Sequence, residues 1–107
     1  MSKYDGLLSE IKSGIEDLAK TSANDYVDEI EKDGSAFLAE IDEDLKRWVT
    51  LLTSQKITAD EFKLLIESNR DLLKMKALTK AGMAKKRMQD IADGIIDIVT
   101  KAAFDLI

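Results

Sequence analysis

The sequence predicts an all-α fold, and three properties of the chain carry that prediction. The 107 residues include no proline, the residue that most strongly disrupts the interior of a helix. Aromatic residues make up only 6% of the chain, which disfavours a β-sandwich or a β-barrel. Apolar residues recur at a helical period along most of the length. We expect a single helical domain over residues 1–107, as is usual for a chain of this length.

The first predicted helix spans about residues 3–53. Apolar residues from Tyr4 to Leu52 recur in steps of three or four, about 3.7 residues per step on average, when Ser22 and Gly34 are counted at two positions of the stripe. The segments 21–25 and 33–35 are candidate breaks, yet the apolar stripe keeps its phase through both. We therefore expect one continuous helix, which would be about 75 Å long.

A short turn at about residues 54–57 is predicted to connect this helix to the next. Thr58 is a good N-cap, and Glu61 three residues later completes the pattern of a capping box. Ile57 and Phe62 occupy the two positions of a hydrophobic staple around the cap. A turn of this length reverses the chain, so the flanking helices should be antiparallel.

The second predicted helix spans about residues 58–106, with an apolar stripe of similar period from Phe62 to Leu106. Small residues narrow the middle of this stripe, at Ala77, Ala81 and Ala84. Gly82 and Gly94 are candidate breaks. The leading architecture is a long antiparallel helical hairpin, and the alternative is a compact bundle of three or four helices within one chain.

The C-terminal half carries more apolar residues than a two-helix hairpin can cover. The surplus row that we expect to face outward includes Ile96, Ala103, Phe104 and Ile107. An exposed apolar patch of this kind marks an interface, and two-fold dimers are the commonest soluble assembly. The sequence therefore predicts a homodimer that forms a four-helix bundle, with these residues at the oligomer interface.

Charge is divided between two blocks of the sequence. Residues 70–87 hold seven basic residues and one acid, whereas residues 25–44 hold nine acids and one lysine. A chain folded near residue 55 places residue i beside residue 111 − i, so the blocks should pair and set the register. The alternative is a nucleic-acid contact through Arg70, Lys74, Lys85, Lys86 and Arg87. No aromatic residue interleaves them, and the net charge of −5 disfavours nucleic acid and anionic membranes as partners.

Composition also argues against catalysis. The chain has no cysteine and no histidine, which removes thiolate chemistry, the commonest general base and the commonest metal ligand. Residues 29–40 resemble an EF-hand calcium loop in spacing, with glutamate where aspartate is usual, but the apolar stripe runs through Gly34 and favours an acidic helix face. We expect no catalytic residue, no cofactor and no metal site.

No segment has the apolar length of a signal peptide or of a membrane span, so we expect a cytoplasmic protein without a membrane partner. The apolar face of residues 91–107 should pack on another helix. The expected function is a non-enzymatic, self-associating helical scaffold or a protein–protein interaction module, which could also bind a helix of a partner protein. The alternative is a small nucleic-acid-binding regulator that uses the basic face of residues 70–87.

Overall fold

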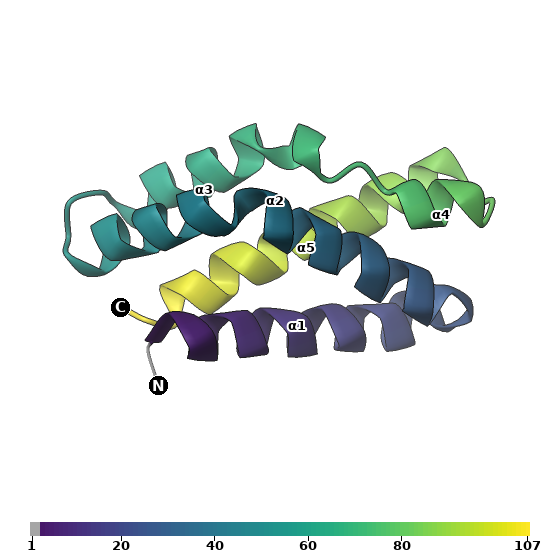
Figure 1. Cartoon of the computed structure of the whole chain (residues 1–107), viewed down its shortest axis with the longest axis horizontal. Coiled ribbons are helices and arrows are strands. Elements are labelled where there is room, and N and C mark those ends of the chain that lie inside the picture. Colours follow the sequence, from purple (N-terminus) through teal and green to yellow (C-terminus); the bar gives the residue numbers. More distant parts are fainter. Residues whose placement is uncertain (1–2) are drawn as a thin grey trace.

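Figure 1 presents the computed structural model of the chain, which describes residues 3–107. The all-α prediction is confirmed, because the described residues form helices and contain no strand. The α-helices are α1 (Lys3–Ser22), α2 (Val27–Thr53), α3 (Ala59–Ser68), α4 (Lys76–Lys80) and α5 (Lys85–Phe104). Single 3₁₀ turns, η1 (Asn24–Tyr26) and η2 (Arg70–Leu72), lie between them.

The helices wrap around one core. Helix α1 packs against α2 and α5, α3 covers another part of α5 and α2, and α4 packs on α2. The start of α1, the C-terminal end of the chain and the α2–α3 turn lie at one end of the molecule, whereas α4 and the α1–α2 connection lie at the other (Figure 1). The longest dimension is 42 Å, far below the length of the predicted hairpin. The hairpin architecture is wrong. The chain forms a compact single-chain bundle, as in the alternative, but the described residues contain five α-helices where that alternative expected three or four.

The continuous first helix predicted over residues 3–53 is interrupted between α1 and α2. Helix α1 ends at Ser22, and Ala23 leaves the helical conformation, with φ of −159° and ψ of 59°. Segment 21–25 is rich in Thr, Ser, Asn and Asp, whose side chains compete with the helical backbone for hydrogen bonds. The break lets α1 fold back on the bundle and bury Ile11 completely. A straight helix would leave that side chain in water.

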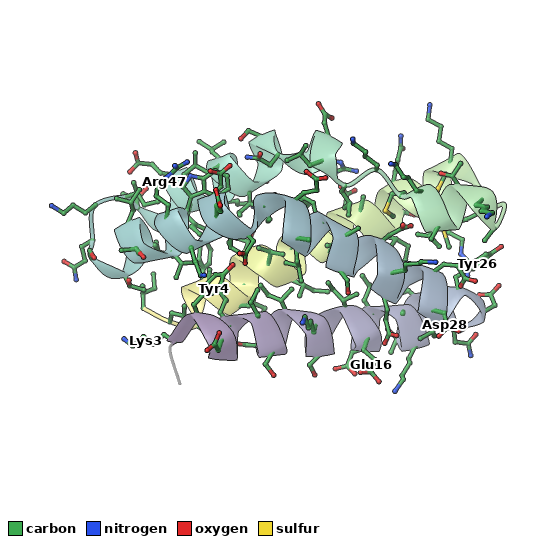
Figure 2. All side chains as sticks on the ribbon, viewed as in Figure 1. Lys3, Tyr4, Glu16, Tyr26, Asp28 and Arg47 are labelled. Atoms are coloured by element: carbon green, nitrogen blue, oxygen red, sulfur yellow. The ribbon has the colours of Figure 1, made fainter. Side chains whose placement is uncertain are left out.

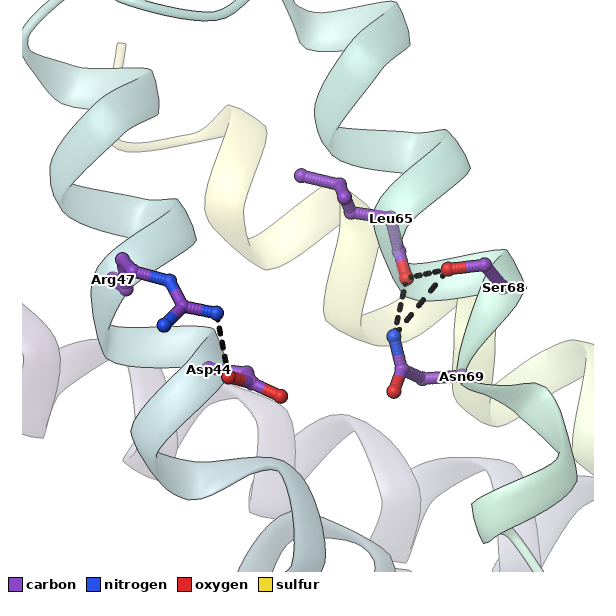
Figure 3. A network of polar contacts seen from close by, with 5 residues as sticks. All are labelled: Asp44, Arg47, Leu65, Ser68 and Asn69. Carbon is purple, nitrogen blue, oxygen red and sulfur yellow. Dashed lines mark hydrogen bonds and ion pairs between the residues drawn. The ribbon is translucent and has the colours of Figure 1, made fainter.

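The second predicted helix, residues 58–106, is divided into α3, α4 and α5. At the C-terminal end of helix α3, the side-chain amide of Asn69 donates a hydrogen bond to the Leu65 carbonyl at 2.8 Å. The same nitrogen lies 3.4 Å from the Ser68 hydroxyl (Figure 3). Gly82, at φ +86°, provides the left-handed turn between α4 and α5. The predicted narrow seam is also wrong, because Ala81 and Ala84 are exposed in this broken region.

Glycine allows α1 and α5 to approach closely. A Cβ atom at Gly14 would lie 2.8 Å from Ile98 Cγ2, and a Cβ atom at Gly94 would lie 2.8 Å from Leu18 Cδ2. A side chain of each helix therefore packs directly on a glycine of the other helix, and a larger residue in place of either glycine would clash with that side chain. Gly94 and Gly34 do not break their helices, in contrast to Gly82.

The start of α3 confirms the capping box. Thr58 Oγ1 accepts a hydrogen bond from the Glu61 amide at 3.1 Å, and Glu61 Oε1 accepts one from the Thr58 amide at 2.9 Å. Phe62, in the following turn, is fully buried. No helix among residues 3–107 combines the length and the apolar character that a membrane crossing requires.

Candidate interaction surface

The residues predicted to form an oligomer interface do not lie together on the surface. Ile96 and Ala103 are buried within the chain, beneath the helices that cover α5. The Phe104 ring is half-buried and packs on Phe62, with ring centroids 6.4 Å apart. Only Ile107 is well exposed, at 65%. The expectation that this row faces water is wrong for Ile96 and Ala103, so the argument for a dimer loses its basis, while the oligomeric state stays a prediction.

The two arginines of the predicted nucleic-acid contact are engaged within the fold. Arg70 forms an ion pair with Asp93 and donates to the Gln89 carbonyl at 3.3 Å. Arg87 donates to Asp25 Oδ1 at 3.2 Å, and its guanidinium lies 5.2 Å from the centre of the Tyr26 ring. These contacts tie η2 to α5 and α5 to η1.

The lysines of the basic block remain on the outside. We use the term lysine surface for five exposed residues, Lys74, Lys76, Lys80, Lys85 and Lys86. In the described part of the chain, none of them forms an ion pair. They belong to α4, the segment before it and the first turn of α5, which lie at the same end of the molecule, where nitrogen-tipped side chains extend outward (Figure 2). We predicted that the acidic and basic blocks would pair, but these five lysines form no ion pair with the acidic block in the described part of the chain.

Two contacts nevertheless follow the expected register. Asp33 contacts Leu78, and Asp25 contacts Arg87, close to the pairing of residue i with residue 111 − i. Arg70 departs from it, because α3, which ends just before this residue, packs on α5. Sequence reasoning missed the individual importance of Asp33. Asp33 lies three residues after Ile30, on the apolar side of the helix, and this spacing could have indicated that its carboxylate is buried.

The carboxylate of Asp33 fixes the start of α4. Asp33 is only 6% exposed, and its two oxygens accept hydrogen bonds from the Ala77 and Leu78 amides, each at 2.9 Å. The residue that precedes the helix, Met75, has φ of +53° and provides no side-chain cap. A side chain of α2 thus caps α4 in place of a local one.

The first turn of α5 carries charge of the unfavourable sign. Lys85, Lys86 and Arg87 are its first three residues, no acid accompanies them, and Ala84 offers no side-chain cap. The positive end of the helix dipole repels such cations. Helix α3, by contrast, begins with Asp60 and Glu61 inside its capping box. Arg87 is paired with Asp25, but we expect the two lysines at the start of α5 to lower the free energy of unfolding.

Acidic side chains cover much of α1 and α2 without forming a metal site in the described part of the chain. Residues 29–40 lie within the continuous helix α2, so they cannot wrap around an ion as a calcium loop does. Where the middle of α1 meets the C-terminal end of α5, a hydrogen bond with Asp105 raises the pKa of Glu10, and this carboxyl pair is exposed. Elsewhere the acids form local ion pairs, such as Asp44 with Arg47 at 2.7 Å (Figure 3).

Comparison of the chain with protein families, with curated proteins and with solved structures finds no match.

Proposed function

We propose that this protein is a non-enzymatic protein–protein interaction module whose lysine surface binds an acidic surface of a partner protein. The observation that carries the proposal is the placement of Lys85 and Lys86 in the first turn of α5, where positive charge lowers the stability of the fold. Sequences depart from locally favourable choices mainly at functional positions. A carboxylate of a partner would neutralise these lysines and also interact favourably with the helix dipole.

A protein partner accounts for the surface better than a nucleic acid does. Lysine is a flexible point charge, whereas arginine makes the bidentate contacts typical of phosphate and base recognition. Both arginines of the basic block are held by internal ion pairs. Tyr26 lies beneath the Arg87 guanidinium, so its ring is not free to stack on a base.

Site-specific photo-crosslinking tests the proposal. A photoreactive phenylalanine analogue replaces Lys80 in one variant and Lys12, an exposed lysine of α1, in a matched control. After irradiation of cells that naturally contain the protein, we expect a discrete adduct from position 80 that resists nuclease and is absent from position 12. A nuclease-sensitive adduct from position 80 would favour the nucleic-acid alternative. The same products from both positions, or none from either, would contradict a dedicated lysine surface.

A further inference from the structure

Asp33 is a buried charge in an apolar stripe. Ile30 and Phe37 flank it along α2 and are both fully buried. No cation among the described residues forms an ion pair with Asp33, and the carboxylate accepts its hydrogen bonds from the backbone amides of Ala77 and Leu78. A buried carboxylate is tolerated only when hydrogen bonds or charges compensate for lost hydration. The compensation here comes entirely from the first turn of α4.

Helix α4 depends on such contacts because it cannot form alone. It contains five residues, far fewer than an isolated helix needs in water. Left-handed backbone flanks it on both sides, at Met75 with φ of +53° and at Gly82 with φ of +86°. Leu78 anchors it in the core, and the Asp33 carboxylate fixes its N-terminal end. Leu73, Met75 and Met83, on either side of α4, are also buried in the core. The segment from residue 73 to residue 84 is therefore attached to the bundle through these few apolar side chains and one carboxylate.

We propose that Asp33 is the positioning residue of the lysine surface, and that residues 73–84 form a unit that detaches while the rest of the bundle stays folded. Lys74, Lys76 and Lys80 belong to this unit, whereas Lys85 and Lys86 start α5. When the unit is attached, the five lysines form one surface. When it detaches, three of them leave the other two. The role of the lysines rests on the proposed function, but the attachment of the segment does not.

Hydrogen exchange of the full chain tests the attachment without any ligand. Asp33→Ala removes both acceptors, and Asp33→Asn retains one oxygen. Glu40→Gln is the matched control, because Glu40 is an exposed carboxylate on α2 that lines the same 90 Å³ hollow as Asp33, Lys74 and Lys76. We expect amide exchange across residues 75–84 to accelerate at least about tenfold in Asp33→Ala and less in Asp33→Asn. Glu40→Gln should match the wild type, and α1 and residues 95–104 should change little in any variant.

Two outcomes would overturn the inference. Uniform acceleration over the whole chain would mean that Asp33 stabilises the bundle globally and positions nothing in particular. Unchanged exchange across residues 75–84 in both Asp33 variants would mean that the carboxylate does not hold the segment. Either result would leave the proposed function standing, because the lysines could still bind an acidic partner.

A deca-glutamate peptide then separates positioning from mere structural support. If the peptide binds the assembled lysine surface, its addition at ten times the dissociation constant should slow exchange across residues 75–84 of the wild type by about tenfold. Binding without slower exchange would overturn the positioning role, because the lysines would bind equally well when detached. Failure of the peptide to bind would count against the proposed function, while the exchange of the Asp33 variants would still decide the attachment.

Discussion

At the scale of single residues, Tyr4 joins the start of α1 to the middle of α2. Its hydroxyl group donates to Asp42 Oδ1 at 2.7 Å and lies 3.2 Å from the Asp42 carbonyl oxygen. Burial of the hydroxyl, followed by the hydrogen bond to Asp42 and the charge of that carboxylate, raises the pKa of Tyr4 well above its usual value. Lys46 lies over the ring, 5.2 Å from its centre. Because of these contacts, the contribution of Tyr4 to the stability of the fold changes with pH in the alkaline range.

The sign of that dependence follows from linkage. The unfolded chain releases the Tyr4 proton near about pH 10, whereas the folded chain keeps it to higher pH. The stabilising contribution is therefore complete below about pH 10 and is lost as the pH rises further. We expect Tyr4→Phe to cost about 1 kcal/mol near neutral pH through loss of the hydrogen bond. The difference between the wild type and Tyr4→Phe should shrink above about pH 10.

Urea denaturation, followed through the fluorescence of the buried Trp48, measures both quantities. A difference that stays constant from neutral pH to about pH 11 would mean that Asp42 does not hold the Tyr4 proton.

At the scale of elements, the contact between α1 and α5 depends on glycine. Gly14→Ala gains helix propensity, worth about 1 kcal/mol, but its Cβ would meet Ile98 Cγ2 at 2.8 Å. Ile98 is branched at Cβ and cannot easily turn aside, and overpacking typically costs about 1–3 kcal/mol. We expect a net loss of about 1 kcal/mol in the free energy of unfolding. Gly6→Ala is the control, because no atom lies within 4 Å of its Cβ position, and it should stabilise the chain. Equal effects of the two substitutions would contradict the close contact.

In the first turn of α5, we expect the substitution of a lysine to raise the stability of the fold, in contrast to Gly14→Ala. Lys85→Glu places a negative charge at the positive end of the helix dipole, and the residue four positions on, Gln89, is neutral. We expect the free energy of unfolding to rise by about 0.3–1 kcal/mol. Lys101→Glu, in the last turn of the same helix, should lower it by a similar amount. Thermal melts of both variants decide the point. A loss of stability in Lys85→Glu would give Lys85 a structural role and remove the main support for the proposed function.

At the scale of the whole molecule, the helical period predicted the fold class but not the number of helices. The apolar stripe keeps its phase across segment 21–25 because α1 and α2 bury the same kind of face against one core. An apolar stripe that keeps its phase is therefore compatible both with one straight helix and with two helices that fold back on each other. The capping box at Thr58 was predictable because its hydrogen bonds join residues close in sequence. The cap of α4 was not, because Asp33 acts across 44 positions.

The candidate surface was predictable only in part. The basic block is evident in the sequence, but its division into internal arginines and exposed lysines depends on which helices become neighbours. Arg70 pairs with Asp93 because α3, which ends just before Arg70, packs on α5, a contact that a hairpin does not make. Ile96 was expected at an interface because a hairpin offers it no cover, whereas the folded chain buries it. Each of these errors follows from the number of helices.

We propose that the lysine surface binds a protein partner, although its two lysines at the start of α5 are expected to lower the stability of the fold. The most direct measurement is the yield of the photo-crosslinked protein adduct from position 80 in two charge-reversed backgrounds. One carries Lys85→Glu with Lys86→Glu. The other carries Lys12→Glu with Lys56→Glu, which changes the net charge equally at exposed positions outside the lysine surface. The account predicts loss of the adduct in the first background and its retention in the second. Equal yields in both backgrounds would contradict it.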